Sequence, residues 1–146
     1  MIEIVDVLFY EDSLGITQRS LKVLRDTLAR SIDHRLAVVE AQTSDITCGY
    51  LILDADTGVA TFTGDGFRHD GGGEGGAGYT SALKLIDLFG LKIQLWERFN
   101  SAILYCPTVR VEQKKRMLLL FARNTADKLS ESDFVCPSER MPCYIA

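Results

Sequence analysis

TFTGDGFRHDGGGEGGAGYTSALKLIDLFGL, residues 61–91, is the stretch around which we expect the rest of the chain to be organised. Eight of the chain's twelve glycines lie between Gly64 and Gly78. Each glycine that is ordered on folding costs more backbone entropy than any other residue, so this density requires a reason. The pattern predicts a strand over 59–63, then a glycine-rich loop, then a helix that opens near Thr80.

A glycine-rich loop that leads into a helix can gather backbone N–H groups around an anion. We therefore expect the segment to bind a phosphorylated small molecule, nucleotide-like in character, for sensing or sequestration. The expected ligand-binding residues of this segment are Phe67, Arg68, Gly73, Gly75, Gly76, Gly78, Tyr79 and Thr80.

Two of these side chains have an alternative interpretation. Arg68 suits a bidentate contact to a phosphate, and Phe67 suits stacking on a base. Equally, Phe67 anchors the loop in the core and Arg68 pairs with Asp65 or Asp70. Residues 73–78 also satisfy G-x-G-x-x-G, but a dinucleotide fingerprint requires its first glycine directly after a parallel strand, and the preceding strands are expected to be antiparallel.

Catalytic side chains are few in this segment. His69 lies beside Asp70, and a carboxylate can orient an imidazole for acid–base chemistry. No nucleophile in a known motif accompanies them, so we do not expect an enzyme. One alternative function is phosphoester hydrolysis by His69, Asp70 and Glu74. Another is that of a homo-oligomeric assembly or protein-interaction module.

The composition limits the class of protein. With 146 residues, 47% hydrophobic and 25% charged, the chain is expected to form a single domain over 1–146. A net charge of −4 and a pI near 5.1 argue against a nucleic-acid partner. No stretch predicts a membrane span or a signal peptide, and the four cysteines are then expected to be reduced thiols in the cytoplasm. No metal or other cofactor is predicted, since the spacing of Cys136 and Cys143 does not match a zinc site.

The fold predicted from the whole pattern is α+β, with a mainly antiparallel sheet and three helices packed on it. The expected helices span 13–32, 80–89 and 108–129, and the expected strands include 2–10, 35–42 and the hairpin 48–53 with 59–63. Residues 91–106 fit either a helix or a two-stranded hairpin, which we prefer, and 130–146 are expected to form an irregular tail.

The second half of the chain adds two expectations. Lys114 and Lys115 lie near the start of the last predicted helix, where positive charge opposes the helix dipole unless an anion is near. They are therefore further candidates for contact with a phosphate, with a solvated basic patch as the alternative. The apolar runs 91–105 and 117–122 predict a homo-oligomer.

Overall fold

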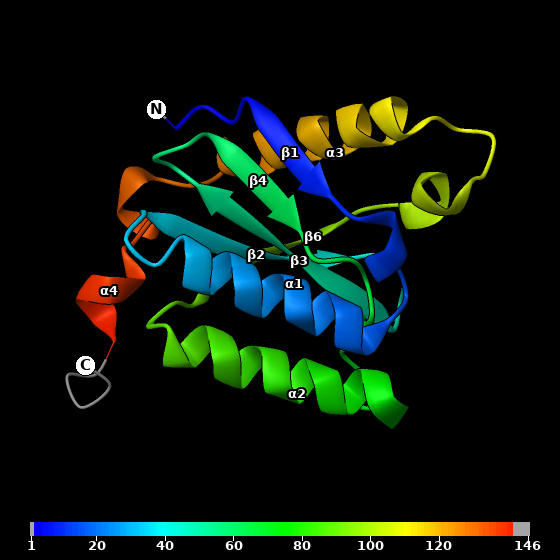
Figure 1. Ribbon diagram of the computed structural model, residues 1–146, viewed down its shortest axis with the longest axis horizontal. Helices are drawn as coiled ribbons and strands as arrows, with labels where there is room; N and C mark the ends of the chain where they lie inside the picture. The colour runs from blue at the N-terminus through cyan, green and yellow to red at the C-terminus, as the bar shows by residue number, and fades with distance from the viewer. Residues whose placement is uncertain (1, 142–146) are drawn as a thin grey trace.

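A computed structural model of the chain describes residues 2–141, in which a six-stranded sheet lies between helices (Figure 1). Five strands run in the order β1, β4, β3, β2, β6, and β5 pairs with one end of β3. The strands are β1 (Asp6–Phe9), β2 (Leu36–Gln42), β3 (Thr47–Asp54), β4 (Val59–Phe62), β5 (Phe67–Arg68) and β6 (Ile93–Arg98). The helices are α1 (Thr17–Arg30), α2 (Gly73–Leu88), α3 (Val111–Ala126) and the short α4 (Pro137–Arg140).

The α+β class is therefore confirmed, but the sheet is mixed. β3 runs antiparallel to β2, β4 and β5, whereas β1 is parallel to β4 and β2 is parallel to β6. The prediction of a mainly antiparallel sheet is correct only for the centre. It failed at the two edges because α1 connects β1 to β2 and α2 precedes β6. Such helical connections allow parallel pairing, which local periodicity does not reveal.

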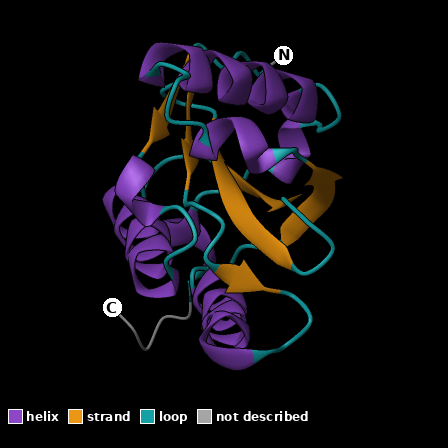
Figure 2. Ribbon diagram, turned by 90° about the vertical axis from the view of Figure 1, so that its right-hand side faces the viewer, coloured by secondary structure: helices purple, strands orange, loops and turns teal. Residues whose placement is uncertain are grey.

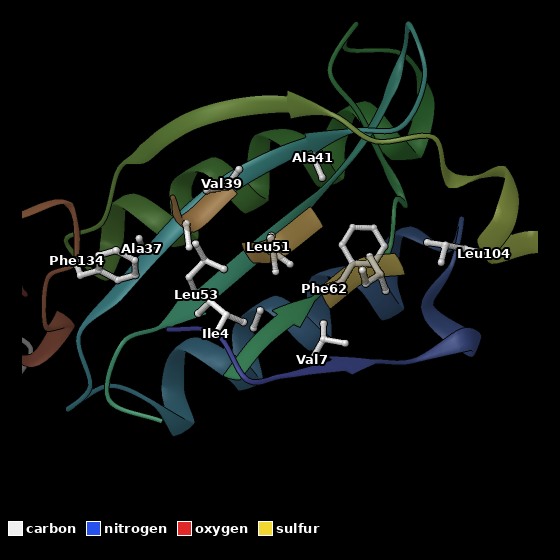
Figure 3. Close-up of a cluster of buried hydrophobic side chains, with 14 residues drawn as sticks. Ile4, Val7, Ala37, Val39, Ala41, Leu51, Leu53, Phe62, Leu104 and Phe134 are labelled. Carbon is white, nitrogen blue, oxygen red and sulfur yellow. The ribbon is translucent and has the colours of Figure 1, made fainter. Parts of the chain in front are cut away.

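The two faces of the sheet carry separate cores, because successive side chains of a strand point to opposite faces. On one face, Leu51 and Leu53 of β3 lie in a buried apolar cluster (Figure 3). Leu118 of α3 belongs to the same cluster. On the other face, Tyr50 and Ile52 pack under α1 and α2. Figure 2 shows the same layering from a second direction, with helices on both sides of the strands.

The predicted hairpin of 48–53 with 59–63 is present as β3 and β4. Leu51 pairs with Phe62 and Leu53 pairs with Ala60, and all four side chains enter the core beneath α3. Gly58 in the connecting turn has φ +73°, a conformation that glycine adopts without strain.

Several predicted boundaries move in the structure. α2 begins at Gly73 rather than near Thr80, because the glycines themselves form its first two turns. Residues 91–106 form neither a helix nor a hairpin: β6 ends at Arg98 and a 3₁₀ helix spans Ser101–Tyr105. The segment predicted as an irregular tail holds another 3₁₀ helix, Glu131–Asp133, and α4; its last residues, 142–146, lie outside the described part of the chain.

Part of that C-terminal segment belongs to the fold. Val135 exchanges two backbone hydrogen bonds with Leu36, and Phe134 is buried beside α3. Along residues 2–141, no helix is both long enough and apolar enough to cross a bilayer.

Candidate functional site

The glycine-rich segment folds into close contacts with the rest of the chain. A side chain on Gly78 would meet the Thr17 methyl group of α1, and one on Gly76 would meet the backbone of Gly71. The Thr17 hydroxyl donates to Gly66 O at 2.6 Å, which ties the preceding loop to α1. The glycines therefore let α2 lie directly against α1 and β5.

Phe67 and Arg68 both make contacts within the chain: Phe67 lies in the core and Arg68 pairs with Asp70. Phe67 is fully buried, and its ring centroid lies 5.5 Å from that of Tyr50. Arg68 donates two hydrogen bonds to Asp70, from Nε at 3.1 Å and from Nη2 at 2.7 Å. Asp70 also accepts from Gly72 N at 3.0 Å, so its carboxylate lies at the start of α2.

In the described structure, no side-chain hydrogen bond joins His69, Asp70 and Glu74 to one another. The hydrogen bond from Arg68 lowers the pKa of Asp70, whose oxygens are both engaged. His69 Nε2 is buried without a hydrogen-bond partner in the described structure. Glu74 and Thr80 are exposed on α2, and the described residues contain no group of three or more side chains placed to hold a metal ion.

Lys114 and Lys115 do not join this segment. They lie on α3, on the opposite face of the sheet from α2. Lys114 is 5% exposed and its Nζ lies 3.2 Å from Glu11 Oε1. Lys115 Nζ lies 4.0 Å from Asp6 Oδ1, so each lysine faces an acid of the N-terminal segment.

Tyr79 of the same segment leads to a different group of residues. Its hydroxyl donates to Glu40 Oε1 at 3.0 Å, and the Tyr50 hydroxyl approaches the same oxygen at 3.5 Å. Gln42 Nε2 donates to the other oxygen of Glu40 at 3.0 Å. Glu40 is 6% exposed on β2, so a carboxylate lies within the layer between the sheet and α2.

The donors to Glu40 are neutral. Burial, together with the charge of Glu40, raises the pKa of both Tyr50 and Tyr79, so both phenols keep their protons. Among residues 2–141, no lysine, arginine or histidine forms an ion pair with Glu40. Arg98 of β6 is the register partner of Gln42. Its guanidinium pairs with Asp45 at 3.1 Å rather than with Glu40.

This carboxylate is reached from an open hollow of about 580 Å³. The hollow lies between α2 and the edge strand β6, and its lining residues are Glu40, Tyr79, Ile93, Gln94, Leu95 and Trp96. Trp96 is the register partner of Glu40, so the two side chains emerge on the same face of the sheet. Its side chain is 61% exposed, and it is the only tryptophan in the chain.

The sequence interpretation missed Glu40 and Trp96. A signal for Glu40 was present, since it is the only charged residue in the otherwise apolar run LAVVEA at 36–41, and a charge in a buried strand marks either a partner or a site. Trp96 carried no such signal, because its exposure depends on the strand order. Comparisons with family models, curated proteins and solved structures found no match for the chain.

Proposed function

We propose that the protein is an interaction module that binds a positively charged side chain of a partner protein in the hollow over Glu40. The observation that carries the proposal is a buried carboxylate that has neutral donors but no cation among the described residues. Removing a charge from water is costly, and neutral hydrogen bonds offset only part of the cost. An ammonium or guanidinium group entering the hollow would supply the missing opposite charge in a medium of low dielectric.

The walls of the hollow suit such a group. Trp96 and Tyr79 both line it, and aromatic faces attract cations through their quadrupoles. The apolar stem of a lysine or arginine would lie along Ile93 while its charged end approaches Glu40.

The edge strand favours a protein as the carrier of the cation. Phe99 N donates to Gln42 O at 2.9 Å, so the backbone of Phe99 faces β2. Backbone N–H and C=O groups of successive residues in a strand point to alternate sides. The backbone groups of Trp96 and Arg98 therefore point away from β2. No strand of the described chain pairs with that side of β6. An extended partner segment can add there by backbone hydrogen bonds, and tryptophan beside such an edge is typical of an interface.

In this proposal the glycines act indirectly. They allow α2 to approach α1, and α2 carries Tyr79 to Glu40. Phosphate binding at the start of α2 and hydrolysis by His69, Asp70 and Glu74 stay as predictions with less support. Arg68 is already paired with Asp70, and Asp70 places a negative charge where a phosphate would lie.

The test uses the fluorescence of Trp96, which reports directly on the hollow because the chain has no other tryptophan. The probe is an extended Thr-Val-Lys-Val-Thr peptide, compared with a peptide that has norleucine in place of lysine. We expect the lysine peptide to bind about tenfold or more tightly, since a charge-assisted hydrogen bond contributes about 1.5–3 kcal/mol.

Glu40→Gln should remove that preference, because it deletes the charge and keeps the shape. Glu97→Gln is the matched control, since Glu97 lies on β6 but pairs with Lys128 at 2.5 Å on the other face. Equal affinity of wild type for the two peptides would refute the proposal, and this comparison holds even if Glu40→Gln does not fold. Retained preference for lysine in a folded Glu40→Gln protein would also refute it.

A further inference from the structure

A second hollow, separate from Glu40, lies beside α1 near the other edge of the sheet. It has a volume of about 260 Å³. Its apolar lining comes from Leu8 of β1, Ile52 of β3 and Val59 of β4. Its charged lining consists of Arg30, His34 and the carboxylate of Asp54. The hollow therefore combines an apolar surface with two basic side chains and one carboxylate, that of Asp54, which is bound to His34.

Asp54 holds His34 in place. His34 Nδ1 lies 2.7 Å from Asp54 Oδ2, and Asp54 Oδ1 accepts from Asp56 N at 2.9 Å and from Thr57 N at 3.1 Å. Asp54 is buried and its three partners fix its orientation. Because Nδ1 is bound to Asp54, Nε2 is the ring nitrogen left to meet a ligand.

The charges around His34 favour its protonated form. The hydrogen bond and the charge of Asp54 raise the pKa of His34, with smaller contributions from Asp56 and Asp33. Of these acids, Asp54 accepts the hydrogen bonds described above. Asp56 pairs with Arg35, whose Nε lies 2.9 Å from Asp56 Oδ1.

Arg30 adds a second positive charge to the lining. It forms no ion pair or side-chain hydrogen bond with any residue of the described chain. Together with Thr27, it also lines a neighbouring hollow of about 370 Å³ that reaches Tyr10 of the segment after β1. The two hollows thus meet at Arg30.

We propose that the hollow beside α1 binds a small organic anion. Its oxygens, from a carboxylate or a phosphate monoester, would contact Arg30 and His34, and its apolar body would lie on Leu8, Ile52 and Val59. Arginine and a protonated histidine both make charge-assisted hydrogen bonds to such oxygens, and the apolar lining contributes contact area. This site is independent of the interaction proposed at Glu40.

The proposal has a definite pH dependence. The imidazolium form donates from Nε2, whereas the neutral form with its proton on Nδ1 presents a lone pair there. Anion affinity is therefore highest below the pKa of His34 and falls as the pH rises through that pKa, which lies above the ordinary value of 6.5. An anion bound there must in turn raise the pKa of His34 further.

The ring signals of the two histidines, followed by NMR, test this directly. Benzoate and phenyl phosphate represent the carboxylate and phosphate sources, and benzylamine is the cationic control. We expect at least one anion to shift the His34 signal in a saturable way and to raise the pKa of His34, with His69 as the internal control because the chain holds two histidines. Binding of only one anion would identify the source.

Two arginine variants on α1 complete the test. Arg30→Gln should weaken the binding of the anion about tenfold, because it removes a charged donor. Arg25→Gln should leave the affinity for the anion unchanged, because Arg25 does not line the hollow and its Nε lies 3.4 Å from Asp26 Oδ1. The proposal is overturned if neither anion shifts His34, if both histidines shift alike, or if Arg30→Gln binds as tightly as wild type.

Discussion

At the scale of single residues, the glycines of α2 have a packing role that explains their density. Gly76 and Gly78 are buried in the helix, where any side chain would meet Gly71 or Thr17. Gly71 and Gly73 differ from them, since they have φ +85° and +60° with open space around them. The first pair allows close approach, and the second pair allows the turn into the helix.

We predict that Gly78→Val destabilises the fold by about 1–3 kcal/mol, because its methyl groups would overpack the contact with Thr17. Ala77→Val is the matched control, since Ala77 is the adjacent helical residue and is exposed. Urea unfolding of both variants measures the difference in the free energy of unfolding. If the two variants lose the same stability, the close contact of α2 with α1 is not what the glycine provides.

At the scale of elements, exposure divides α3 into a packed face and an outer face. Leu118 is fully buried between α3 and the sheet, whereas Leu120, two residues later, is 51% exposed. The helical period of 3.6 places these two leucines on different sides of the helix.

This division makes a prediction with its own control. Leu118→Ala should cost about 2–5 kcal/mol, because it removes buried methyl groups and leaves a cavity. Leu120→Ala should change the free energy of unfolding by no more than about 0.5 kcal/mol. Chemical denaturation gives both values, and a larger loss for Leu120→Ala would mean that a second surface covers α3 in solution.

At the scale of the whole molecule, helices cover both faces of the sheet but leave apolar side chains exposed. Trp96 on β6, Leu88 at the end of α2 and Leu120 on α3 are each more than two-fifths exposed. Homo-oligomer formation therefore stays a prediction, since association would remove these side chains from water.

Light scattering at micromolar concentration should then give a mass of at least twice the 16.2 kDa of a single chain. If β6 forms the contact, Trp96→Glu should reduce the mass to that of a single chain; if α3 forms it, Leu120→Glu should do so. A mass of 16.2 kDa for the wild type would contradict the prediction and leave the β6 edge free for another partner.

The sequence alone determined the elements with strong local patterns. The helix predicted over 13–32 is present as α1, and Leu24 and Leu28, four residues apart in that segment, are both buried. The hairpin predicted from 48–53 and 59–63 is present, and alternate residues of its two strands share one face of the sheet. These predictions succeeded because a helical or strand period is a property of neighbouring residues.

Only the tertiary structure decided which distant residues meet. Glu40 and Tyr79 are 39 residues apart, and His34 and Asp54 are 20 residues apart. Each contact depends on the order of strands in the sheet and on how closely a helix lies against it. No local period encodes those distances. From the glycines alone the sequence predicted a phosphate-binding loop, which stays a prediction. The fold shows in addition that the glycines let α2 lie against α1, and α2 brings the Tyr79 hydroxyl to the buried carboxylate of Glu40.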